Sequence, residues 1–241
     1  MNVLIVFAHP ELCSFNGALK VRAVDVLKRA GHEVVVSDLY RLGWKAAVDA
    51  DDFPGVWTDP DFLDVSAEQE RVSAAHETPP DVLAEQEKVA RCDLMILQFP
   101  LWWSGMPAIL KGWVDRTMAR GFAYAEGRAY DSGPLRGRRA MVCTTTGTPS
   151  GLYDPHGTDD DLDRALWPVH HGILGCLGFD VLPPFVARAP GEVSAKQREE
   201  YLTEYAERLL AVRPEETRPD RGAGNFVTGP HRPAPNELPV P

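Results

Sequence analysis

The chain has 241 residues, of which 44% are apolar and 25% charged, an ordinary composition for a globular protein. Its formal charge of −10 argues against a general nucleic-acid binder, because such a protein needs a basic face. The sequence holds neither an apolar run of about 18 residues, which a membrane-spanning helix needs, nor a signal peptide's basic start and long apolar core. Its four cysteines form no C-x-x-C pair, so we expect free thiols and a cytoplasmic protein without membrane insertion.

Short apolar runs alternate with helical patterns along the chain. The runs expected to form strands are Val3–Ala8, Val34–Val36, Leu94–Phe99, Ala140–Thr144 and Phe179–Val186. Helical patterns cover residues 19–30, 82–90, 107–114, 166–177 and 194–209. Strands that are apolar throughout predict a parallel sheet covered on both faces. Five strands and five helices match an α/β, doubly wound, flavodoxin-like sheet with strand order 2-1-3-4-5.

Two segments fall outside this alternation. Residues 47–77 fit no strand and hold many acids, which predicts a long surface excursion. Residues 213–241 show no apolar periodicity, and seven prolines lie between Pro214 and Pro241. We therefore expect a single domain over residues 1–212. It is followed by a tail that is either disordered or laid over a partner subunit as an arm.

The doubly wound topology predicts where a ligand binds. Ligands lie beyond the carboxyl ends of the strands, so the loops after Ala8, Phe99 and Thr144 should converge. The first loop has no G-x-G-x-x-G and no Walker lysine. It ends in Ser14 and Asn16 at the start of a helix, where backbone N–H groups and the helix dipole favour a phosphate. Plain helix capping by the same two residues is the alternative.

The second and third loops indicate what else the ligand carries. Trp102 and Trp103 follow a buried strand, and aromatic walls suit a flat, conjugated ligand. A hydrophobic dimer surface is the alternative, and both interpretations can hold. The segment 144–151 is rich in hydroxyls and glycines, which offer donors to ring carbonyls and nitrogens, unless it is only an irregular polar turn. A planar, phosphate-bearing ligand that touches all three loops would be a flavin.

Motifs spread over residues 2 to about 210 resemble one known family. They are Ala8-His9-Pro10, Ser14-Phe15-Asn16, Gln98-Phe99-Pro100-Leu101 with Trp103, Pro107 to Trp113, Gly121-Phe122-Ala123-Tyr124, Thr145-Thr146-Gly147 and Leu166-Trp167-Pro168. The family is that of the NAD(P)H:quinone oxidoreductases, the DT-diaphorase-like flavoproteins. The resemblance implies flavin-dependent, two-electron reduction of quinones or similar flat acceptors by NAD(P)H, through ping-pong hydride transfer.

The same resemblance implies which residues hold the cofactor. FAD is expected over FMN, because the long excursion over residues 47–77 and Arg198 favour room for an adenine half. The pyrophosphate would be held by His9, Ser14, Phe15 and Asn16. The ring would be lined by Pro100, Leu101, Trp102, Trp103 and Ser104. Its polar edge would bond Thr145, Thr146, Gly147 and Tyr153, and Arg198 would lie near the adenine half.

The catalytic residues that the resemblance implies are Tyr153, Asp159, Tyr124 and Gly147. Tyr153 is the donor expected to stabilise negative charge on the reduced ring. Tyr124 would close the site from the other subunit of a homodimer. Asp159 stands where the family has a histidine, and it acts as a general acid only with a raised pKa; otherwise it is solvated and points away. Some relatives carry a metal near the position of His171, held also by a second histidine. That second position is Gly175 here, so no metal is expected.

Three other functions remain open on the sequence. The first is an azo-, nitro- or flavin-reducing enzyme on the same scaffold, because one stacked slot accepts many flat acceptors. The second is a flavin-bound regulatory subunit of a transport system. The third is a one-electron flavodoxin carrier, against which the Trp-rich loop and Tyr124 indicate a nucleotide-sized slot. Ser104, where relatives often carry Phe, makes one pocket wall smaller, so acceptor preference could differ.

Overall fold

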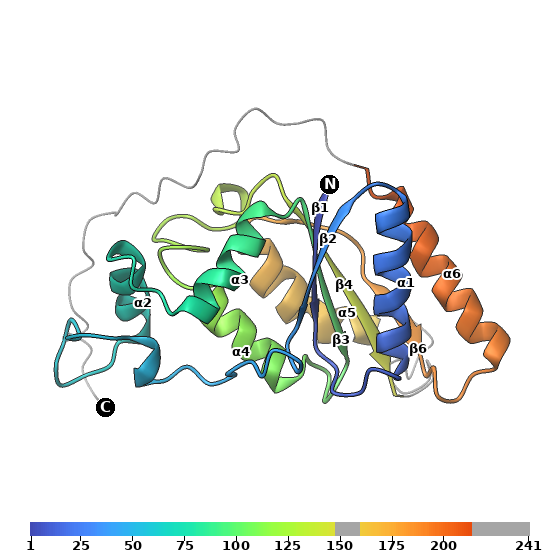
Figure 1. Cartoon of the computed structure of the whole chain (residues 1–241), viewed down its shortest axis with the longest axis horizontal. Helices are drawn as coiled ribbons and strands as arrows, with labels where there is room; N and C mark the ends of the chain where they lie inside the picture. The colour runs from blue at the N-terminus through green and yellow to red at the C-terminus, as the bar shows by residue number, and fades with distance from the viewer. Residues whose placement is uncertain (148–159, 214–241) are drawn as a thin grey trace.

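The computed structural model describes residues 1–147 and 160–213, and its centre is one parallel sheet (Figure 1). The strands are β1 (Asn2–Phe7), β2 (Glu33–Asp38), β3 (Leu94–Pro100), β4 (Arg139–Thr146), β5 (Asp180–Val181) and β6 (Phe185–Arg188). Their order is β2-β1-β3-β4, and β5 and β6 both pair with β4. The predicted α/β, flavodoxin-like sheet is therefore confirmed.

The fifth predicted strand is wrong in one respect, because it forms two short strands instead of one. Pro183 and Pro184 lie between β5 and β6. Proline has no N–H to donate to a neighbouring strand, so these two residues interrupt the ladder against β4. The last strand consequently ends at Arg188, two residues beyond its predicted end.

Helices cover both faces of the sheet, as the continuously apolar strands predict. On one face α1 (Phe15–Arg29) and α6 (Ala195–Ala211) lie side by side (Figure 1). On the other face lie α3 (Pro80–Arg91), α4 (Ala108–Thr117) and α5 (Asp160–Trp167). All seven residues of β3 are buried between the two layers. The described chain forms one α/β domain with a separate apolar core on each face of its sheet.

The helix predicted over residues 166–177 differs from what the structure shows. An α-helix ends at Trp167, and a π-helix, η4, follows from Pro168 to Gly175. The Cys176 N–H bonds the carbonyl of His171, five residues earlier, at 3.1 Å. Pro168 has no N–H to continue the α-helical ladder, which accounts for the change of helix type at that residue.

The excursion over residues 47–77 contains no strand, as predicted, but it does contain a helix that the sequence did not indicate. This helix, α2 (Val65–Ala74), is capped by Asp64, whose side chain accepts from the Ala67 N–H at 3.0 Å. A short 3-10 turn, η1 (Ala50–Asp52), precedes it. In Figure 1, α2 lies at the far side of α3 from the sheet. The excursion is thus an ordered layer outside the sheet's helices.

Arg116 of α4 ties the start of this excursion to the domain. Its guanidinium is buried, donates to the Asp52 carboxylate at 2.7 Å and to the Lys45 carbonyl at 3.2 Å, and also reaches Asp81 at 2.7 Å. Close packing adds to this anchor, since a Cβ at Gly112 would lie 2.0 Å from the Ala46 carbonyl oxygen. A buried cation paired in this way is costly to disrupt.

No described helix combines the length and hydropathy that crossing a membrane requires. All four cysteines are free thiols, as their spacing predicts. The predicted tail from residue 214 onward lies outside the described residues.

Candidate active site

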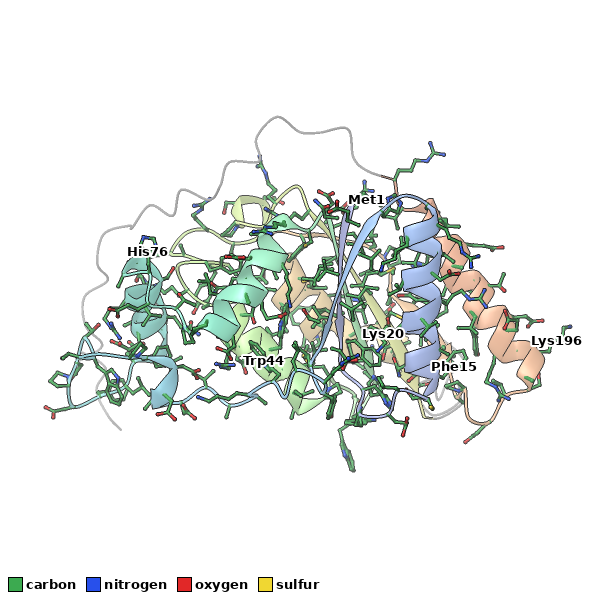
Figure 2. All side chains as sticks on the ribbon, in the orientation of Figure 1. Met1, Phe15, Lys20, Trp44, His76 and Lys196 are labelled. Carbon is green, nitrogen blue, oxygen red and sulfur yellow. The ribbon has the colours of Figure 1, made fainter. Side chains whose placement is uncertain are left out.

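A cavity of about 800 Å³ opens at the carboxyl edge of the sheet, where the three predicted loops meet. Figure 2 labels Phe15 and Lys196 near the ends of α1 and α6 at this edge, so the N-termini of both helices flank it. The lining residues are His9, Cys13, Ser14, Phe15, Asn16, Ala18, Pro100, Leu101, Trp102, Thr145, Thr146, Gly147, Pro190, Gly191, Ala195, Arg198, Glu199 and Leu202. Most of the residues predicted to hold a cofactor are therefore in one place.

The first loop is built to present backbone N–H groups to an anion. Ser14 caps α1, and its hydroxyl accepts from the Gly17 N–H at 3.1 Å. The N–H groups of Phe15 and Asn16, in the same first turn, have no intrahelical acceptor. Gly17 is required because a Cβ there would lie 1.9 Å from the Leu12 carbonyl oxygen. The loop thus packs closely against the helix and leaves two donors at its positive end.

His9 lies at the start of this loop, with its ring 6.3 Å from that of Trp102. Its Nδ1 lies 3.0 Å from both the backbone nitrogen and the carbonyl oxygen of Glu11, so it accepts from the N–H when unprotonated and donates to the carbonyl when protonated. Burial lowers the pKa of His9, and the bond and charge of Glu11 only partly oppose that shift. The ring is therefore mostly neutral near pH 7, and it can gain a proton if an anion binds beside it.

The second loop is a tight turn that holds two side chains in a strained backbone. Trp102 and Gly105 exchange two backbone hydrogen bonds of 3.0 Å. Between them, Trp103 and Ser104 have φ angles of +52° and +56°, the left-handed region that costs a non-glycine residue about 1–2 kcal/mol. Trp102 lines the cavity, whereas Trp103 is fully exposed and neither it nor Ser104 lies among the lining residues.

The third loop contributes the end of β4, where Thr145 and Thr146 are both buried. The Asn16 side-chain amide donates to the Thr145 hydroxyl at 2.7 Å, and Gln98 donates to the Asn16 carbonyl at 2.7 Å. These two bonds join α1, β3 and β4 at the floor of the cavity. The Thr146 backbone carbonyl accepts the Ala189 N–H at 3.1 Å, which ties the end of β4 to the residue after β6.

Arg198 lines the cavity, but the structure also gives it a role that the sequence did not predict. Its guanidinium donates to the carbonyls of Pro190 at 3.2 Å and Val193 at 2.7 Å. It therefore fixes the loop that forms the cavity wall after β6. Sequence reasoning missed this loop, although a Pro-Gly pair after a strand and before the predicted helix start at Ser194 was a usable signal.

The residues predicted to be catalytic are not all brought to the cavity. Gly147 lines it, whereas the Tyr124 hydroxyl lies 3.4 Å from Gln69 of α2, away from the lining residues. Tyr153 and Asp159 lie outside the described residues. His171 stacks on Trp167 with ring centroids 4.7 Å apart. Over residues 1–147 and 160–213, no three His, Cys, Asp or Glu side chains are grouped to hold a metal.

A flavin fits the residues that the cavity presents. The free N–H groups of α1 suit a phosphate, the threonine hydroxyls suit the ring's polar edge, and Pro100, Leu101 and Trp102 offer an apolar wall. Asn16 lines the cavity and Gln98 bonds its carbonyl; the buried side-chain oxygens Asn16 Oδ1 and Gln98 Oε1 both lack a hydrogen-bond partner among the described residues. Unsatisfied polar atoms of this kind concentrate where a ligand or water completes the site.

Comparison with known proteins identifies the family to which the chain belongs. The chain belongs to a family with the flavodoxin-like fold, whose model matches residues 1–211. Within that fold it belongs with the quinone-type dehydrogenases. It is 40% identical over 218 residues to human ribosyldihydronicotinamide dehydrogenase [quinone], covering 90% of this chain and 94% of the relative. It is also 40% identical to NAD(P)H dehydrogenase [quinone] 1 of Cavia porcellus, over 86% of this chain and 76% of that one.

Solved structures agree with this assignment. A protein from Klebsiella pneumoniae proposed to be a quinone reductase matches with a TM-score of 0.82 and 43% identity, over 87% of this chain and 83% of the other. The NAD(P)H:quinone oxidoreductase of Methanothermobacter marburgensis matches with a TM-score of 0.67 and 26% identity, over 87% and 95% of the two chains.

Proposed function

We propose that this protein is a flavin-dependent oxidoreductase that transfers two electrons from NAD(P)H to a quinone. The observation that carries the proposal is the cavity of about 800 Å³, in which free helix N–H groups, an apolar aromatic wall and threonine hydroxyls converge. Relatives about 40% identical over most of the chain are dehydrogenases of the same quinone-reducing type. When bound, the flavin supplies the hydride chemistry, and the protein supplies binding, orientation and charge stabilisation.

We propose FAD as the cofactor because of the length of the cavity. It runs from Trp102 and Thr146 past the first turn of α1 to Arg198 and Leu202 of α6. A phosphate at Ser14 and Phe15 would end an FMN molecule there, and the wall beyond it would stay uncovered. The adenosine half of FAD would cover this wall, which Arg198 holds in place through the Pro190 and Val193 carbonyls.

The catalytic roles proposed for individual residues rest on the family resemblance. Tyr153 would donate to the reduced ring, and Asp159 would take the place of the family's histidine. Tyr124 lies outside the lining of its own subunit's cavity, which supports a role in closing the cavity of a second copy in a homodimer. The exposed Trp103 on its strained turn would then meet the ring or the partner subunit. We place the enzyme in the cytoplasm, where its four free thiols would stay reduced.

Two measurements test the proposal together. The chromophore released from purified protein is identified by chromatography, and we expect FAD. Quinone reduction is then followed with NADH, NADPH and dihydronicotinamide riboside as separate donors, because the relatives include enzymes named for both kinds of donor. We expect turnover with at least one. A protein that binds flavin but reduces no quinone with any of them would favour a regulatory subunit instead.

A further inference from the structure

We infer that Asn16 is a positioning residue, which fixes the Thr145 hydroxyl as a hydrogen-bond donor toward the cavity. This adds to the role that the family resemblance implies, in which Asn16 helps to hold the pyrophosphate. The inference deepens the proposed function, since it rests on a flavin in this cavity.

The geometry of Asn16 directs its side chain away from the solvent. The residue is only 2% exposed, and its Nδ2 donates to Thr145 Oγ1 at 2.7 Å. Gln98, which is completely buried on β3, donates to the Asn16 carbonyl at 2.7 Å and so restrains the first turn of α1 from beneath. Asn16 therefore offers an anion its backbone N–H, while its amide is committed to β4.

This bond decides what the Thr145 hydroxyl can do. A hydroxyl that accepts a hydrogen bond still has its own proton to donate. Thr145 lines the cavity, and within the described part of the chain its hydroxyl donates to no protein atom. Its proton is therefore left for a ligand atom or a water molecule in the cavity, and the carbonyl and nitrogen edge of a flavin ring has such acceptors.

Two side-chain oxygens without partners indicate that this cluster serves a ligand site. A purely structural cluster would satisfy its own hydrogen bonds. Asn16 Oδ1 and Gln98 Oε1 are both buried with no partner among the described residues. Burying polar atoms without partners costs free energy, and this cost is retained at the cavity floor. As negative charge develops on the reduced ring, a fixed donor at Thr145 becomes more favourable, because hydrogen bonds to charged acceptors are stronger.

A double-mutant cycle on flavin binding tests the inference. FAD is titrated into apoprotein of wild type, Asn16→Ala, Thr145→Val and the double variant, and the dissociation constant and the visible absorption bands of the bound flavin are recorded. Asn16→Ala leaves the Thr145 hydroxyl unfixed, and Thr145→Val removes it. Because both changes act on the same donor, we expect each to weaken binding about tenfold and the double variant to be no weaker than the worse single variant. Thr145→Ser keeps the hydroxyl and should restore the wild-type affinity and spectrum.

Thr144→Val is the matched control for lost stability. The Thr144 hydroxyl is buried on the same strand, but it donates to the Phe99 carbonyl at 2.8 Å and does not line the cavity. We expect this control to lower the free energy of unfolding of the apoprotein while leaving the affinity and the flavin spectrum unchanged.

The outcomes separate this inference from the proposed function. If the wild type binds FAD but the two losses multiply to about a hundredfold, or Asn16→Ala binds as tightly as the wild type, the inference is wrong and the proposed function stands. A Thr144→Val variant that binds as weakly as Thr145→Val would also overturn it, because stability would then explain the effect. A wild type that takes up no flavin overturns both.

Discussion

Two buried polar clusters in this domain differ in how completely their hydrogen bonds are satisfied. In the anchor cluster, Arg116 bonds Asp52, Asp81 and the Lys45 carbonyl. In the cavity cluster, made of Gln98, Asn16 and Thr145, two side-chain oxygens lack partners among the described residues. The first cluster needs nothing further and holds the excursion in place. The second leaves acceptors for a ligand or water, and the strained Trp103–Ser104 turn lies on a neighbouring loop at the same edge.

This comparison predicts that changes in the anchor cluster affect stability, whereas changes near the cavity cluster affect binding. The largest effect should come from Arg116→Met, which removes the closer of the two cations beside the buried Asp52 and leaves only Lys45, at 3.3 Å. We expect the free energy of unfolding to fall by about 3–5 kcal/mol, measured by denaturant titration of the apoprotein. The FAD affinity of the folded fraction should not change. A variant as stable as the wild type would show that the Arg116 cluster does not contribute to the stability of the domain.

Two glycines offer a matched pair for the next largest effect. A Cβ at Gly17 would lie 1.9 Å from the Leu12 carbonyl oxygen, and one at Gly112 would lie 2.0 Å from that of Ala46. Alanine at either position should therefore cost about 1–3 kcal/mol of stability, because the backbone must shift. Only Gly17→Ala displaces the first loop of the cavity, so only it should weaken FAD binding, by about tenfold or more. Equal effects of both variants on binding would remove the distinction between the two regions.

The anchor cluster also predicts a dependence of stability on pH. Burial alone would raise the pKa of Asp81, but the hydrogen bond and charge of Arg116 outweigh it, and that pKa is lowered. Because the folded pKa is below the unfolded one, the Asp81 contribution is complete above about pH 5 and is lost as the pH falls below about 4. The stability difference between wild type and Asp81→Asn should therefore shrink on acidification. A difference that stays constant from pH 6 down to about pH 3 would contradict the assignment.

The smallest predicted effect concerns His9 in the cavity. Burial lowers the pKa of its imidazole in the free protein, with partial opposition from Glu11. A bound pyrophosphate would favour the protonated ring, so FAD binding should take up protons. The affinity should then rise a few-fold between about pH 7.5 and pH 5.5, and His9→Gln should remove this slope. A wild-type affinity that does not change over this range would place His9 away from the phosphates.

The sequence predicted the first three loops of the cavity because each follows a long, continuously apolar strand. The runs Val3–Ala8, Leu94–Phe99 and Ala140–Thr144 mark the carboxyl edge of the sheet, and the doubly wound topology then brings their loops together. The loop after β6 was missed because no long apolar strand precedes it. β6 has only four residues, and the prolines before it obscure where the last strand begins and ends.

Other features depend on side-chain directions, which composition does not specify. Trp103 is fully exposed on a turn with positive φ, and the Asn16 side chain is held inward by a contact with Thr145, 129 residues away in sequence. Helix α2 was not predicted because it lacks a clear apolar stripe, and ion pairs such as Glu68–Arg71 at 2.6 Å help to hold it instead. Local patterns indicate elements, whereas these contacts exist only in the folded chain.

The central claim is that the cavity holds a flavin which passes two electrons from NAD(P)H to a quinone. The most direct test follows the visible absorption of the flavin in the purified protein under anaerobic conditions, first with one equivalent of NAD(P)H and then with one of quinone. We predict full bleaching by the donor and full recovery with the quinone, in equal stoichiometry. A protein that takes up no flavin, or a bound flavin that the donor does not reduce, would contradict the account.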